Sequence, residues 1–71
     1  MKYRFSLKMS TQEFLPYYRG EIQQVVVTTF EHIRVQFPAM YLRKYLTSDG
    51  VEGIFSLETE NNKFKKLEKI N

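Results

Sequence analysis

Few side chains in this sequence could act together in catalysis. The single histidine, His32, lies in a stretch that reads as a turn, and the chain has no cysteine to join it in a nucleophilic pair or a metal site. Glu58 and Glu60 could share a metal ion, but they stand where a strand ends in a polar turn, which favours a solvated pair. An enzyme needs a convergent set of groups. We therefore expect no catalytic residues, no cofactor and no metal site.

Aromatic and basic side chains interleave at two places in the chain. The residues concerned are Tyr17, Tyr18, Arg19, Tyr41, Arg43, Lys44 and Tyr45. Proteins that bind nucleic acids use rings to stack on bases and cations to hold phosphates. A structural role explains the same residues, with Tyr18 and Tyr45 facing the core and two cations complementing the dipole at a helix C-terminus. We favour the structural role.

The charge of +3 is unevenly distributed along the chain. Residues 1–20 and residues 61–71 each carry four cations and one carboxylate, whereas the segment between them carries three cations and six carboxylates. If the first and last strands become neighbours, as in a closed sheet, their cations form one basic face. The candidate contact residues for a nucleic acid or another partner are Lys2, Arg4, Lys8, Arg19, Lys63, Lys65, Lys66 and Lys69, together with Tyr17 and Tyr41.

The elements that would position these side chains begin with a strand and a helix. Apolar and polar residues alternate over residues 2–9, which predicts a strand with a core face and a basic face. Ser10 and Glu13 have the spacing of a capping box and predict a short helix over about residues 11–18. The packing candidates in this helix are Phe14, Leu15 and Tyr18.

The middle of the chain predicts a hairpin that runs into a second helix. Residues 23–29 contain an unbroken β-branched run, which favours a central strand covered on both sides. Residues 30–32 then form the turn into a strand over residues 33–37, where apolar and polar residues alternate. Pro38 ends that strand and can begin a short helix, because it lacks an amide donor and has a fixed φ.

The last third of the chain predicts a second hairpin. Residues 51–58 read as a strand, in which Gly53 indicates a bulge or a bend. A polar turn follows at residues 59–62. Apolar residues recur at every third position of residues 63–70, a spacing that suits a helix or a bulged strand. We favour the strand, because the strand and turn before it read as a hairpin.

These elements predict one small α+β domain spanning residues 1–71. The order is β-α-β-β-α-β-β, with about five strands in a curled, barrel-like antiparallel sheet and two short helices. A chain of this size buries only ~60% of its unfolded surface, and the aromatic share of 15% leaves more ring surface than such a core hides. The expected core residues are Phe5, Leu7, Val25, Val27, Val35, Phe37, Leu42, Leu46, Phe55 and Leu57.

Several short blocks of the chain resemble a known family. They are Tyr17-Tyr18-Arg19-Gly20, Val25-Val26-Val27, Val35-Gln36-Phe37-Pro38-Ala39, Leu42-Arg43, Gly50-Val51-x-Gly53-x-Phe55 and Leu67-Glu68-Lys69-Ile70. The family comprises small bacterial proteins catalogued as domain of unknown function 2835, and similar proteins tend to have a glycine where this chain has residues 30–32. Some similar proteins carry a topoisomerase II label. The resemblance implies a bacterial, cytoplasmic, stand-alone domain and carries over no activity or functional residue.

The distribution of apolar residues gives an expectation for where the protein is located. No apolar run approaches the ~20 residues of a membrane span, and the N-terminal alternation differs from a secretory signal, so we expect a cytoplasmic protein with no targeting segment. No small-molecule substrate is evident. We expect a non-enzymatic interaction module that binds a protein partner or a second copy of itself. The alternative is a weak nucleic-acid-binding domain that uses the basic face.

Overall fold

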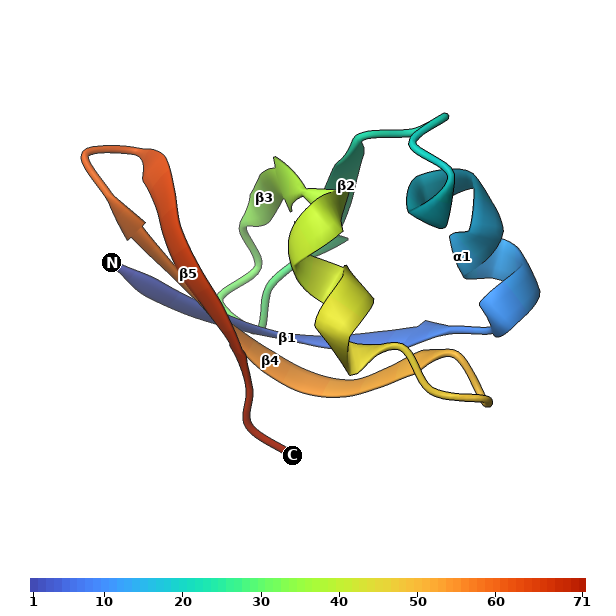
Figure 1. Ribbon diagram of the computed structural model, residues 1–71. Coiled ribbons are helices and arrows are strands. Elements are labelled where there is room, and N and C mark those ends of the chain that lie inside the picture. The colour runs from blue at the N-terminus through green and yellow to red at the C-terminus, as the bar shows by residue number, and fades with distance from the viewer.

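The computed structural model describes all 71 residues and confirms the α+β class and the order of the elements (Figure 1). Five strands and two helices follow one another along the chain. They are β1 (Lys2–Met9), α1 (Thr11–Tyr18), β2 (Gln24–Thr28), β3 (Arg34–Pro38), η1 (Ala39–Tyr45), β4 (Val51–Glu60) and β5 (Lys63–Lys69).

The strands form two antiparallel sheets, so the prediction of one barrel-like sheet is wrong. In the larger sheet β4 lies between β1 and β5, and β2 pairs only with β3 in a separate ribbon. The two sheets meet at the β2–β3 turn, where the amide of Phe30 donates to the carbonyl of Arg4 at 2.7 Å. No ladder of further bonds continues between β1 and β2, so the sheet stays open. The first and last strands are therefore not neighbours.

The core lies between the two sheets and is built around Phe5. Its ring centroid lies 5.6 Å from that of Phe37 in β3 and 5.6 Å from that of Phe55 in β4, so one side chain joins both sheets. Of the expected core, Leu7, Val35 and Leu46 are only partly buried. The buried apolar residues are Phe5, Phe14, Val25, Val27, Phe37, Ala39, Leu42, Val51, Phe55, Leu57 and Leu67.

Helix α1 begins at the predicted capping box. The hydroxyl of Ser10 accepts from the amide of Glu13 at 3.0 Å, and the Glu13 carboxylate accepts from the amide of Ser10 at 2.9 Å. The bond from the Ser10 amide is the main reason that the pKa of Glu13 lies below its usual range, since it favours the charged carboxylate. Phe14 is buried. The other two packing candidates, Leu15 and Tyr18, are 39% and 49% exposed, so the prediction that they pack in the core is wrong. The ring of Tyr18 instead lies under the guanidinium of Arg43, whose Cζ is 5.0 Å from the ring centroid.

The ribbon of β2 and β3 is buried on one face only. Val25 and Val27 point into the core, whereas Val26 between them is 49% exposed. The β-branched run thus correctly predicted a strand and wrongly predicted cover on both sides. The reason is that β-branched residues favour extended backbone whether or not both faces are buried.

The second helix, η1, is a 3-10 helix that connects the ribbon to the larger sheet. Pro38 is the last residue of β3 and caps η1 instead of opening it. The ring of Tyr45 meets the ring of Phe55 edge-on at 5.3 Å, and its hydroxyl donates to the carbonyl of Leu67 at 3.1 Å. One tyrosine of η1 therefore contacts both β4 and β5.

The last segment is the expected bulged strand. Glu58 pairs with Lys66 and Thr59 pairs with Phe64, so Lys65 is an extra residue in β5. This bulge explains the spacing of three between Phe64 and Leu67.

No bulge occurs at Gly53, which stays in register with Leu7. A Cβ at Gly53 would lie 2.6 Å from Cε of Lys69 and 2.7 Å from the carbonyl oxygen of Asn71. The C-terminal residues therefore pack directly against this glycine, in the space that a side chain would fill.

Truncation of Phe37 tests the role of the aromatic core. We expect Phe37→Ala to lower the free energy of unfolding by about 3–5 kcal/mol, because it removes a fully buried ring that packs between the two sheets. The matched control is Ile70→Ala, where the side chain is 55% exposed and the change should stay within about 0.5 kcal/mol. Thermal unfolding measures both, and similar melting temperatures for the two variants would contradict the central position of Phe37.

The β2–β3 turn contains a strained residue. His32 has φ 64°, a region that costs an L-residue about 1–2 kcal/mol and glycine almost nothing. We expect His32→Gly to raise the melting temperature by several degrees, since part of this gain is offset by the entropy of glycine in the unfolded chain. His32→Ala should give no gain, because alanine keeps the strain. A stabilisation equal in both variants would show that the imidazole, and not the backbone, is unfavourable.

The capping box predicts a pH dependence of stability. Because folding lowers the pKa of Glu13, the stabilisation is present above the unfolded pKa and is lost as the pH falls through the folded pKa. NMR titration of the Glu13 carboxyl should give a lower pKa in the wild type than in Ser10→Ala, which removes the hydroxyl and keeps the backbone amide. Identical titration curves would mean that the hydroxyl of Ser10 does not contribute to the lowered pKa of Glu13.

Candidate functional site

The predicted basic face is divided by a strand of opposite charge. Lys2 and Lys8 of β1 lie directly opposite Glu58 and Glu52 of β4. On the other side of β4, the ammonium of Lys65 lies 3.6 Å from Glu58 and 3.4 Å from Glu60. The outer face of the larger sheet is therefore striped, with an acidic strand between two basic ones.

The other predicted contact residues are dispersed. Lys66 lies in β5, and its ammonium is 3.4 Å from the carboxylate of Glu68 in the same strand. Arg19 caps α1, away from the larger sheet's outer face. The ring of Tyr41 stacks on Phe64 at 4.1 Å and is partly exposed. The structure thus does not gather these residues, together with Lys63, into one patch.

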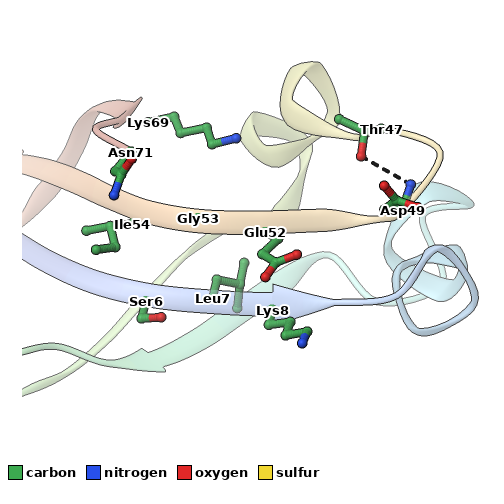
Figure 2. Close-up of a pocket in the computed structure, with 10 residues that line it drawn as sticks. All are labelled: Ser6, Leu7, Lys8, Thr47, Asp49, Glu52, Gly53, Ile54, Lys69 and Asn71. Atoms are coloured by element: carbon green, nitrogen blue, oxygen red, sulfur yellow. Dashed lines mark hydrogen bonds between the residues drawn. The ribbon is translucent and has the colours of Figure 1, made fainter.

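Lys8 and Lys69 do line one polar hollow of about 480 Å³ at the end of the larger sheet (Figure 2). In Figure 2 the two side chains lie on opposite sides of the β1–β4 pair, with Glu52 between them. Asp49 adds a second carboxylate to the lining. Two cations and two carboxylates balance, so the hollow favours neither an anion nor a cation. No group of three or more His, Cys, Asp or Glu side chains is placed to hold a metal ion.

The outer face of the β2–β3 ribbon has a different character. The residues that point outward are Gln24, Val26, Thr28, Arg34, Gln36 and Pro38. Val26 is half exposed and lies opposite Gln36 in the middle of the ribbon. Arg34 is the only charged residue among them. This face is therefore nearly uncharged, in contrast to the striped face of the larger sheet.

Apolar side chains are exposed at both ends of this ribbon. At the turn, Phe30 is 49% exposed and Ile33 is 44% exposed. At the other end lies a hollow of about 290 Å³, which we call the α1–η1 hollow. It is lined by Tyr17, Gly20, Ile22, Gln23, Gln24, Pro38, Ala39, Met40 and Arg43. Its exposed apolar residues are Ile22 and Met40.

The α1–η1 hollow and the ribbon are one continuous surface. Gln24 and Pro38 line the hollow and are also the outward-facing pair at that end of the ribbon. We call the outward face of the ribbon, together with the hollow and the exposed turn residue Phe30, the ribbon surface. Ile33 is not part of it, because Ile33 pairs with the buried Thr29 on the core-facing side of the ribbon. The ribbon surface is the candidate functional site.

Hydrogen bonds hold the walls of the hollow in place. Gly20 takes φ 81° after α1, which lets the chain turn back toward β2. The amide of Ala39 donates to the carbonyl of Gln23 at 2.9 Å. Nη2 of Arg43 donates to the carbonyl of Tyr18 at 2.6 Å, while its guanidinium covers the Tyr18 ring. These contacts connect α1, the loop after it and η1.

The candidate residues predicted from the sequence are mostly charged, and of them Tyr17 lines the α1–η1 hollow. The available signal for the rest of the ribbon surface, which was not predicted, was the excess of apolar side chains over what a small core can bury. Periodicity could not locate that excess, because the run containing Val26 has no polar residue to mark its outer face.

The comparisons with known proteins give a family and no activity. No helix of the structure has the length and apolar character needed to cross a membrane. No curated protein and no solved structure matches the chain. The model of the family described as "Protein of unknown function (DUF2835)" matches residues 1–70, and the chain therefore belongs to this family.

Proposed function

We propose that this domain is a non-enzymatic protein–protein interaction module that associates with a second copy of itself through the ribbon surface. The observation that supports this proposal is the distribution of exposed apolar side chains. Four of the ten large apolar residues exposed in this domain lie on the ribbon surface, namely Ile22, Val26, Phe30 and Met40.

Contiguous apolar surface with few charges is typical of protein interfaces. Large exposed apolar patches on small soluble domains mark sites of interaction, and charged residues are depleted in the centre of an interface. The ribbon surface has an exposed valine at its centre and one charged residue on its strands. Methionine at its edge adapts to different partner shapes, because its side chain is unbranched and flexible.

Binding of nucleic acid is the alternative, and it has less support. A nucleic acid on the outer face of the larger sheet would meet the carboxylates of Glu52 and Glu58 between the two rows of cations. Lys65 already lies near two carboxylates. A titration with short single- and double-stranded oligonucleotides at low salt, repeated with Lys65 and Lys66 changed to Glu, tests this alternative.

Sedimentation velocity over a wide range of protein concentration tests the main proposal. We expect the wild type to associate as its concentration rises. Val26→Glu should weaken this association at least tenfold, which corresponds to about 1.4 kcal/mol, because it places a charge at the centre of the ribbon surface. The matched control is Ser6→Glu, at an exposed position of β1 on the outer face of the larger sheet. Equal effects of the two variants would place the interface elsewhere, and a wild type that stays monomeric would exclude self-association.

A further inference from the structure

We infer that two copies of this chain pack their ribbon surfaces against each other antiparallel, with the two-fold axis near Val26. This inference rests on the self-association proposed above and specifies its geometry. The two ribbons would lie face to face, so that the β2–β3 turn of each copy covers the α1–η1 hollow of the other.

The symmetry follows from the layout of the ribbon. The pair of Val26 and Gln36 is the middle one of the five residue pairs that join β2 to β3. The β2–β3 turn lies at one end of the ribbon, and α1 with the start of η1 lies near the other (Figure 1). The hollow is at this second end, because Gln24 and Pro38 line it. A two-fold axis through the middle pair exchanges the two ends. Both hollows are then covered in the same dimer, and the assembly is closed.

The two ends differ in shape in a way that suits this exchange. One end is a turn with exposed Phe30, and the other is a hollow whose rim exposes Ile22 and Met40. A parallel arrangement would place turn against turn and hollow against hollow, which leaves both hollows unfilled. Aromatic anchors that enter an apolar pocket are common at the centres of protein interfaces.

The charges at the two ends also favour the antiparallel arrangement. The turn carries Glu31, whose carboxylate accepts from the amide of Arg4. The hollow is lined by Arg43, which donates to the carbonyl of Tyr18. Two charges without such a bond are Arg34 at the turn end of the ribbon and Glu21 beside the hollow. Both are exposed, and neither takes part in an ion pair within the chain. The antiparallel arrangement brings Arg34 of each copy toward Glu21 of the other. A parallel arrangement would bring the two copies of Arg34 together.

The size of the surface explains why both ends are needed. A stable interface buries about 800 Å² per partner, which is roughly a sixth of the 5083 Å² of this domain. Two strands of five residues cover only about 10 by 17 Å. The strands alone are too small, so the turn and the hollow must contribute. We expect a weak dimer whose population depends on concentration.

Edge-to-edge pairing of the larger sheet is less suited to self-association. Its two edge strands, β1 and β5, carry seven lysine and arginine side chains and one carboxylate. A second copy that paired with either edge through the same strands would bring like charges together, and lysines on edge strands are a common means of preventing such pairing.

Charge reversal at the two ends tests the geometry. At low salt, we expect Arg34→Glu and Glu21→Arg each to weaken self-association at least fivefold, because each variant alone places like charges together. An equimolar mixture of the two variants should recover association close to that of the wild type, since every contact between different copies then joins opposite charges. Lys8→Glu, on the larger sheet, is the matched control and should have no effect. High salt should reduce the differences, because it screens exposed charges.

The outcomes separate the geometry from the proposed function. If the mixture does not recover association while Val26→Glu still weakens self-association relative to the wild type, the ribbon surface is an interface but the antiparallel arrangement is wrong. If Arg34→Glu alone associates as the wild type does, Arg34 does not face Glu21 of the other copy and the antiparallel arrangement is wrong. If Val26→Glu has no effect, or if the wild type is monomeric at every concentration, the proposed function and this inference both fail.

Discussion

The contact of Phe5 with Phe37 and Phe55 is the interaction on which the rest of the structure depends. Phe5 comes from one edge strand of the larger sheet, Phe55 from its centre and Phe37 from the ribbon, and all three rings are buried. The two sheets share one backbone bond near this point, from Phe30 to Arg4. Because the chain has no disulfide, packing of these rings must hold the sheets together.

This packing leaves the two sheets with different outer faces. The larger sheet places its charges outside, and the opposite charges on neighbouring strands neutralise one another. The ribbon is only two strands wide and turns a valine outward at its centre. A domain of this size has too little volume to cover every apolar side chain. Some of the remaining apolar side chains are exposed on the outer face of the ribbon, because no other element packs against that face. This is the physical origin of the ribbon surface.

Local signals in the sequence were reliable wherever the structure depends on neighbours in the chain. The spacing of Ser10 and Glu13 predicted the helix cap, because both bonds close within one turn. The Asn61-Asn62 pair predicted the turn before β5, since both residues adopt positive φ, which asparagine tolerates. The prediction of one curled sheet failed because pairing between β1 and β2 depends on distance in space, which periodicity does not report.

The sequence by itself determined the class, the order of the elements and most of the core, because alternation, caps and turn residues act over a few positions. Only the tertiary structure decided that β4 lies between β1 and β5 and so divides the basic residues. It alone decided that Val26 faces outward and that Gln24 and Pro38 join the ribbon to a hollow. These features depend on which strands meet, and strand pairing is set by the packing of side chains that lie far apart in the chain.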